Sequence, residues 1–512
     1  MVSKTLFLTL GMSHAVVMEQ LRIVQTDKRF RCLHMVNFSF DLGGDGKDVL
    51  ELLLQVFKSR AWNTIKLHRC RGKYSHRVVQ AAMAAKVRQL LLAPTRICSQ
   101  TTLTALSIGL AAKACSISTL YLSKVRWNRG LMELVAASFA RNTSLADLAI
   151  EYCVFPSDDS TAHQLLAEAL AQQSSSLQHL SLAHCSLEDD QCRDLIGALC
   201  NNPLLLELNL EGNKCNVGGL EALSVLVSRS SLLVLDLSSQ KVKEGMQGMD
   251  LGYLSPGLAK SKIRCLQLGN NRLETRSLQA LAKALKNNTC LQTLHLAWTV
   301  LDQASMLALA NSLRWNTTLQ TLVLYECGID NFGLSRLANR LSQIRGLLHL
   351  DLGGKQNFDA AGLWSLQGGL QRNEELQHVI LPQQEDPLFQ AAAQQVFFLC
   401  DVNRGGRRFL KCQHQAPAGL WPLVLSAVWE LETEDGNSCD HLLPFAMEED
   451  ESTAAVAQSQ LLDLSRSTGS HVVDAACSQR TNHVFPHSKQ AKMRQASVFY
   501  HLLRNGASLQ LS

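Results

Sequence analysis

The sequence predicts an α/β solenoid, in which short parallel strands line a concave side and helices cover the convex side. Three observations lead to this fold class. A leucine-rich phrase recurs about every 28 residues. Within each copy, apolar residues first alternate, as in a strand, and then recur every three or four positions, as in a helix. A single copy is also too small to bury a core of its own, so the copies must stack.

The repeated phrase is clearest in NTTLQTLVLYECGID, and earlier copies read CLQTLHLAWTVLD and LLLELNLEGNKCN. We aligned the copies on the first apolar position of L-x-x-L-x-L. The clear copies start at Leu145, Leu177, Leu205, Leu232, Ile263, Leu291, Leu319, Leu347 and Leu376. Weaker copies start at Leu33, Trp62, Val87 and Ile117. We therefore predict about thirteen repeats over residues 31–385, preceded by an N-terminal cap at 1–30.

Energetics require the copies to stack. Burying about six aliphatic side chains stabilises one copy by roughly 9–18 kcal/mol. Ordering its backbone costs roughly 28–56 kcal/mol in conformational entropy. Strand pairing and contact with neighbouring copies must supply the difference.

A polar or small residue follows each predicted strand, before the helical half begins. The examples are Asn213, Asn271, Cys185, Cys327 and Thr299. Because unpaired backbone groups are costly inside a protein, we expect these side chains to point inward and hydrogen-bond the loops of neighbouring copies. Four cysteines (Cys70, Cys153, Cys185 and Cys327) then have a structural explanation and are not expected to be catalytic or metal-binding.

The period and the L-x-x-L-x-L-x-x-N/C-x-L phrase, followed by a helix, resemble leucine-rich repeats of the ribonuclease-inhibitor type. The resemblance covers about residues 31–385. It implies a horseshoe-shaped leucine-rich repeat solenoid with its parallel β-sheet on the concave side. It says little about function, because many unrelated binding proteins use this fold.

Composition argues against several classes of protein. The net charge is +5 over 512 residues, too small to predict a nucleic acid or an anionic membrane as the partner. The 16 cysteines include no C-x-x-C pair, which indicates free thiols in a reducing compartment, the cytoplasm or also the nucleus. MVSKTLFLTLGMSHAVV is only weakly similar to a signal peptide, and we interpret it as a capping strand.

The repeat period ends after Leu381. We predict capping helices over 386–431, a disordered loop over 432–495 and a terminal helix over 496–512. The segments FFLCDVNRGGRRFL, LWPLVL and FYHLLRNG resemble the C-terminal ending of leucine-rich repeat proteins of diatom-type algae. That resemblance implies a eukaryotic, photosynthetic host and carries no assigned biochemistry.

The sequence contains two stretches that partly match a phosphate-binding loop and a zinc site, and neither match is complete. The stretch from Gly43 to Lys47 has Asp41 and Asp48 where a phosphate loop needs Gly and Ser or Thr. His483, His487 and Cys477 lack the spacing of a zinc site. No catalytic motif is present, so we expect no enzyme activity, no cofactor and no metal.

Residues at the third, fifth, seventh and eighth positions of each copy are predicted to face the concavity. The start of this face is basic, with Lys66, His68, Arg69 and Lys124, and Asp147 opens an acidic middle. Aromatic residues on a rigid surface are typical interface anchors. The predicted partner-binding residues are Tyr121, Glu151, Tyr152, Glu207, Glu211, Asp236, Trp298, Tyr325 and Glu326.

The sequence thus favours a non-catalytic scaffold, expected to be a monomer, that binds a partner protein on its concave face. Two alternatives remain open. The first is a GTPase regulator of the Ran GTPase-activating type, whose repeats are similar. Such proteins often carry an acidic tail, to which the segment MEEDES is only faintly similar. The second is a ubiquitin-ligase substrate adaptor, although no F-box-like helices precede the repeats. A nucleotide-driven receptor is disfavoured because the sequence shows no nucleotide-binding motif.

Overall fold

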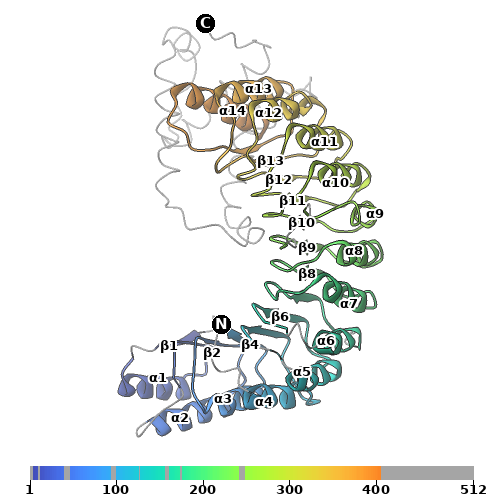
Figure 1. Cartoon of the computed structure of the whole chain (residues 1–512). Coiled ribbons are helices and arrows are strands. Elements are labelled where there is room, and N and C mark those ends of the chain that lie inside the picture. The colour runs from blue at the N-terminus through green and yellow to red at the C-terminus, as the bar shows by residue number, and fades with distance from the viewer. Residues whose placement is uncertain are drawn as a thin grey trace, which may run out of the picture. The chain divides into compact units, whose positions relative to one another are not determined.

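One parallel sheet runs through a computed structural model of the chain, with its strands in chain order (Figure 1). The structure describes residues 4–9, 12–39, 46–93, 100–125, 127, 129–155, 161–172, 176–241 and 248–404. The chain divides into two compact units, residues 1–399 and 400–512. The strands and helices α1 to α13 belong to the first unit, and the predicted segments after residue 404 lie outside the described residues.

The sheet has 14 strands. They are β1 Lys4–Thr9, β2 Phe30–Val36, β3 Thr64–His68, β4 Gln89–Ala93, β5 Thr119–Ser123, β6 Asp147–Glu151, β7 His179–Ser181, β8 Glu207–Asn209, β9 Val234–Asp236, β10 Cys265–Gln267, β11 Thr293–His295, β12 Thr321–Val323, β13 His349–Asp351 and β14 His378–Ile380.

A helix follows each strand and covers the same side of the sheet (Figure 1). The helices are α1 His14–Thr26, α2 Gly46–Lys58, α3 Ser75–Ala84, α4 Gln100–Leu110, α5 Arg129–Arg141, α6 Thr161–Gln172, α7 Asp189–Leu199, α8 Val217–Arg229, α9 Ser255–Leu258, α10 Thr275–Asn287, α11 Gln303–Leu313, α12 Asn331–Ala338, α13 Ala360–Leu370 and α14 Pro387–Arg404. A short 3₁₀ helix, η1, spans Leu341–Gln343. None of the described helices is both long and apolar enough to cross a membrane.

The leucines of the repeated phrase form the core between sheet and helices. Leu294 of β11 pairs with Leu322 of β12, which pairs with Leu350 of β13. All three side chains are at most 1% exposed. The α/β solenoid predicted from the period is therefore confirmed.

The N-terminal register differs from the sequence alignment. Leu33, taken as a first apolar position, pairs with Ile65, which holds the fourth position of its copy. Phe30 therefore begins this copy, and a phenylalanine in place of leucine hid the register. Strand β1 also pairs in parallel with β2, so the sheet has one strand more than the thirteen copies found by pattern.

The predicted inward-pointing residues form a ladder of buried hydrogen bonds. Asn271 donates through Nδ2 to the carbonyls of Leu237 and Leu268, at 2.8 and 2.9 Å. The thiols of Cys185 and Cys327 donate to carbonyl oxygens of the preceding repeat, at 3.0 and 3.1 Å. Two glutamines that the pattern overlooked, Gln240 and Gln356, make equivalent bonds.

Thr299 is the exception in this ladder. Its side chain is fully buried, yet its Oγ1 has no hydrogen-bond partner among the described residues. The threonine side chain has a shorter reach than the asparagine, glutamine or cysteine that fills this position in other repeats.

A second ladder accounts for the N-glycosylation-like sequences at Asn142 and Asn316. Both side chains are at most 4% exposed. Each amide donates to a carbonyl of the preceding repeat and accepts a hydrogen bond from the backbone N–H of the leucine that opens its own repeat. These asparagines lie in the turn between a helix and the next strand.

The last repeat packs against helix α14. The ring of Phe389 stacks on Phe358, with 6.3 Å between their centroids, and Phe389 is only 2% exposed. This contact fits the predicted start of a capping segment at residue 386, and the capping role itself stays a prediction.

Candidate functional site

The strand register aligns the variable positions of the repeats on the sheet face that the helices do not cover, called here the open sheet face. At the fifth position, Asn209 pairs with Asp236, and at the third position His179 pairs with Glu207. Glu211 follows β8, and Trp298 and Tyr325 follow β11 and β12. All the predicted partner-binding residues therefore belong to the strands, or strand ends, of one continuous parallel sheet.

The eighth position of the phrase has left-handed backbone in most described repeats. Tyr152, Trp298 and Glu326 have φ angles of 53°, 57° and 52°. Non-glycine residues adopt this conformation only at a cost, and the tight turn after each strand imposes it here. This turn directs the side chain at the eighth position outward, since Tyr152 and Trp298 are 48% and 57% exposed.

The middle of the open sheet face pairs carboxylates with histidines. The carboxylate of Asp147 accepts a 2.7 Å hydrogen bond from Thr119 Oγ1 and contacts His179 Nδ1. His184 Nε2 lies 3.4 Å from Glu211 Oε1. Asp147 and Glu211 thus each contact a side chain of a neighbouring repeat.

Glu151 is held at both carboxylate oxygens. Tyr121 OH donates to one at 3.0 Å and Ser181 Oγ to the other at 2.6 Å. Burial, with the adjacent Glu151 charge, raises the pKa of Tyr121 to about 12. Next to this group, Tyr152 stacks on His184 with 4.6 Å between centroids and 11° between ring planes.

Asp236 differs from the other predicted contact residues. Its side chain is only 9% exposed, and its Oδ1 accepts the Ser238 N–H at 2.8 Å. Asn209 and Asp351 make the same local turn with Glu211 and Gly353. The fifth position is therefore partly structural, and Asp236 offers little surface to a partner.

Electrostatics sets the proton affinity of two of these acids. Burial raises the pKa of Asp236, partly offset by its hydrogen bonds with Ser238. Burial also raises the pKa of Glu211, and the nearby Asp236 charge adds to this shift while His184 opposes it. The middle of the open face therefore disfavours additional negative charge.

The C-terminal part of the open sheet face carries an aromatic pair. Trp298 and Tyr325 meet edge to face, with ring centroids 5.5 Å apart and an interplanar angle of 71°. Tyr325 lies over Gly354, where an added Cβ would come within 2.8 Å of its ring and 2.2 Å of Glu326 Cγ. We call Trp298, Tyr325 and Glu326 with Gly353 and Gly354 the aromatic corner.

The N-terminal end of the open sheet face carries the basic residues Lys66 and Arg69, which the sequence placed there. Lys66 of β3 pairs in register with His34 of β2. Burial lowers the pKa of His34, and the Lys66 charge lowers it further. Arg69 occupies the left-handed turn after β3.

Sequence reasoning overlooked a set of histidines on the same face. His349 and His378 stack with 4.8 Å between centroids, and burial lowers the pKa of His295 and of His349. With His179 and His184, they occupy third, fifth and eighth positions. The position rule that selected the aromatic and acidic residues would have found them.

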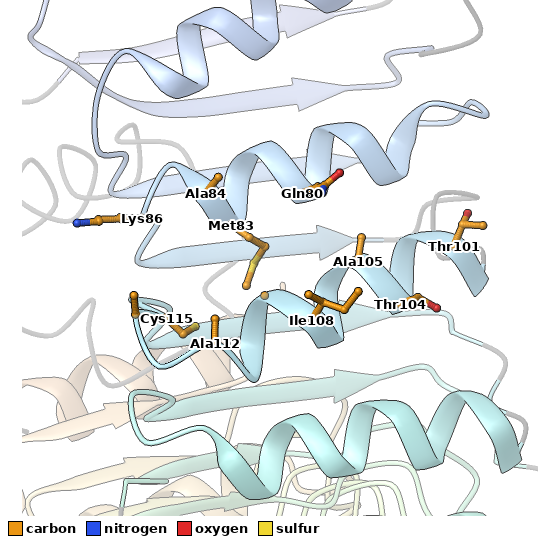
Figure 2. Close-up of a pocket in the computed structure, with 12 residues that line it drawn as sticks. Gln80, Met83, Ala84, Lys86, Thr101, Thr104, Ala105, Ile108, Ala112 and Cys115 are labelled. Carbon is orange, nitrogen blue, oxygen red and sulfur yellow. The ribbon is translucent and has the colours of Figure 1, made fainter.

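A separate groove of about 480 Å³ lies on the helix side, between α3 and α4 (Figure 2). Its lining is mainly apolar and includes Met83, Ala105 and Ile108, with Ile108 70% exposed. No set of polar groups converges in its described lining, so it is not a candidate for catalysis.

Comparison with known proteins gives partial relatives. No family model matches the chain. The chain is 30% identical to mouse NACHT, LRR and PYD domains-containing protein 12 over 224 residues, which are 38% of this chain and 21% of that protein. It is 26% identical to bovine NACHT, LRR and PYD domains-containing protein 5 over 275 residues, 52% of this chain and 23% of that protein. The chain thus spans about a fifth of the length of these relatives.

Among solved structures, the chain resembles one in the crystal structure of a TLR13–ssRNA13 complex. The TM-score is 0.39 at 17% identity, covering 70% of this chain and 46% of the other. A likeness of this size supports no inference about function. The regular strand–turn–helix repeat and its single parallel sheet show that the chain folds as a leucine-rich repeat solenoid, in agreement with the LRR in the names of its partial relatives.

Proposed function

We propose that the protein is a non-catalytic scaffold of the ribonuclease-inhibitor type, which binds a partner protein on the concave, open face of its sheet. The aromatic corner carries this proposal. It presents an exposed tryptophan, a half-buried tyrosine and an exposed glutamate within two adjacent repeats. Tryptophan and tyrosine are the residues that most often dominate binding energy at protein interfaces.

The frame beneath the aromatic corner supports binding without large rearrangement. Leu296 and Leu324 precede the corner residues and are fully buried. The Trp298 N–H donates to the Tyr325 carbonyl at 2.8 Å, and the Glu326 N–H donates to the Gly353 carbonyl at 3.0 Å. A surface fixed in this way loses little conformational entropy when a partner docks.

The middle of the open face adds selectivity to the proposed interface. The carboxylates of Glu207 and Glu211 would favour a partner with complementary positive charge. Their neighbours His179 and His184 contact Asp147 and Glu211, so part of the acidic surface is already engaged within the chain. In our proposal the aromatic corner supplies affinity, and the acidic middle sets the orientation of the partner.

The test compares two double variants of the full chain. Partners are first captured from the native cell and identified by mass spectrometry, and the Kd of each purified partner is then measured. We expect Trp298→Ala with Tyr325→Ala to raise the Kd about tenfold or more. The matched control, Trp364→Ala with Tyr253→Ala, removes one tryptophan and one tyrosine that are 44% and 39% exposed on the helix side.

The control pair should leave the Kd unchanged, and both pairs should unfold thermally near the wild-type temperature. An undiminished affinity in the Trp298 and Tyr325 variant would remove the aromatic corner from the interface. We also propose a reducing compartment, in keeping with the free thiols of all the described cysteines. As a second point, we propose that the protein is a monomer. Equilibrium sedimentation tests the second point.

A further inference from the structure

The fold concentrates positive charge along one edge of the sheet. Every strand from β2 onward is preceded by a turn that links it to the previous helix. The parallel register of β9 to β14 aligns their turns side by side. Between α8 and β14, these turns hold seven basic residues and two acidic ones, Glu374 and Glu375, and the last turns of α8 and α10 add Arg229 and Lys286. We call the nine residues the basic edge: Arg229, Lys260, Lys262, Arg264, Lys286, Arg314, Arg340, Arg345 and Arg372.

Seven of the nine cations are exposed to solvent, and Arg314 and Arg340 are half-buried. Lys260, Lys262 and Arg264 share one turn and are exposed, as are Arg345 and Arg372. None of the nine residues forms an ion pair with another residue in the described part of the chain. Their charges are therefore not neutralised within the described structure.

An exposed aromatic ring lies within the basic edge. Trp315 is 61% exposed. Lys286 Nζ and Arg314 Cζ lie 5.3 and 5.9 Å from the centroid of its ring. A flat π surface between cations is the arrangement that proteins use to stack a base beside its phosphates.

The helix dipole accounts for only part of this charge. Cations are favoured in the last turn of a helix, which explains Arg229 and Lys286. Lys262, Arg264 and Arg345, however, lie beyond their helix ends, within the turns. The turn at 200–206 contains no charged residue at all, so the fold does not require cations at this edge.

We propose that the basic edge binds a single-stranded nucleic acid, with the cations on its phosphates and Trp315 stacked on a base. This surface is separate from the open sheet face and its aromatic corner. An anionic membrane is the less favoured ligand, because Trp315 is the one exposed large apolar side chain described in these turns between α8 and β14. Adjacent strands are about 4.8 Å apart, so cations recur closely enough to follow a phosphate chain.

The experiment measures binding of a fluorescent single-stranded oligouridine to the full chain by anisotropy, from about 50 mM to about 200 mM salt. Single-stranded DNA, duplex RNA and vesicles containing phosphatidylserine serve as comparison ligands. The edge variant is Lys260→Gln with Lys262→Gln and Arg264→Gln. The matched control is Lys241→Gln with Arg272→Gln and Lys355→Gln, which removes three exposed cations from the opposite edge.

We expect wild type to bind the single strand with a strong salt dependence. The edge variant should bind about tenfold or more weakly, and its slope of log affinity against log salt should be shallower by about 2, since each phosphate contact contributes about 0.7. Trp315→Ala should weaken binding about fivefold or more. The control variant should match wild type.

Three results would overturn the proposal. The first is no binding of any single strand at low salt. The second is an equal loss in the edge and control variants, which would indicate nonspecific attraction. The third is binding to the vesicles without binding to RNA or DNA. Circular dichroism of each variant checks that altered binding is not caused by unfolding.

Discussion

Replacing Asn271 with alanine tests whether the buried ladder holds the repeats together. The side chain is 4% exposed, and its Oδ1 accepts the Gln240 N–H at 2.8 Å. Its Nδ2 donates to the carbonyls of Leu237 and Leu268. The substitution therefore removes the partner of one buried N–H and of two buried carbonyls.

The expected loss follows from those three groups. An unsatisfied buried polar group costs about 1–3 kcal/mol, so Asn271→Ala, which affects three such groups, should lower the free energy of unfolding by at least about 3 kcal/mol. Urea denaturation followed by circular dichroism measures it, with the slope m checked because repeat proteins can unfold in stages. Hydrogen exchange at the Gln240 amide gives a local readout.

Thr299→Val is the matched control in the next repeat. Threonine and valine have nearly the same shape, and the hydroxyl that is lost has no partner among the described residues. We expect stability to be unchanged or to rise by about 1 kcal/mol. If Asn271→Ala and Thr299→Val changed stability equally, hydrogen bonding would not be the cause, and the ladder would lose its proposed role.

Two further predictions concern the open sheet face. Gly354→Ala should destabilise the protein by about 1–2 kcal/mol and displace Tyr325, because its φ is 68° and the new Cβ would meet Tyr325 and Glu326. Gly328→Ala is its control, because Gly328 has a similar φ of 65° but only Asn357 lies within 4 Å of the added Cβ, at 3.4 Å. Equal losses of stability in urea denaturation would refute the steric argument. Asp236→Asn should stabilise the protein at neutral pH, because burial raises the folded pKa of Asp236 above its usual 3.8. A raised carboxyl pKa makes stability fall as pH rises, so the gain should vanish below about pH 3.8, and a pH-independent gain in thermal unfolding would contradict this reasoning.

The sequence by itself determined the architecture of the first unit. Leucine spacing is a local property, and a strand followed by a helix every 28 residues or so can bury its leucines only by stacking. The same spacing identified Asn213, Asn271 and the buried cysteines as hydrogen-bonding residues. It also identified the variable positions that reach solvent, including Trp298 and Tyr325.

The tertiary structure decided what depends on the register between repeats. The pairing of Asp147 with His179, the burial of Asp236 and the unpaired hydroxyl of Thr299 all depend on residues about one repeat away in sequence. The basic edge has the same origin. The net charge of +5 does not reveal the basic edge, because it is a sum over the whole chain. The fold places the cations of the turns along one edge of the sheet and many carboxylates elsewhere.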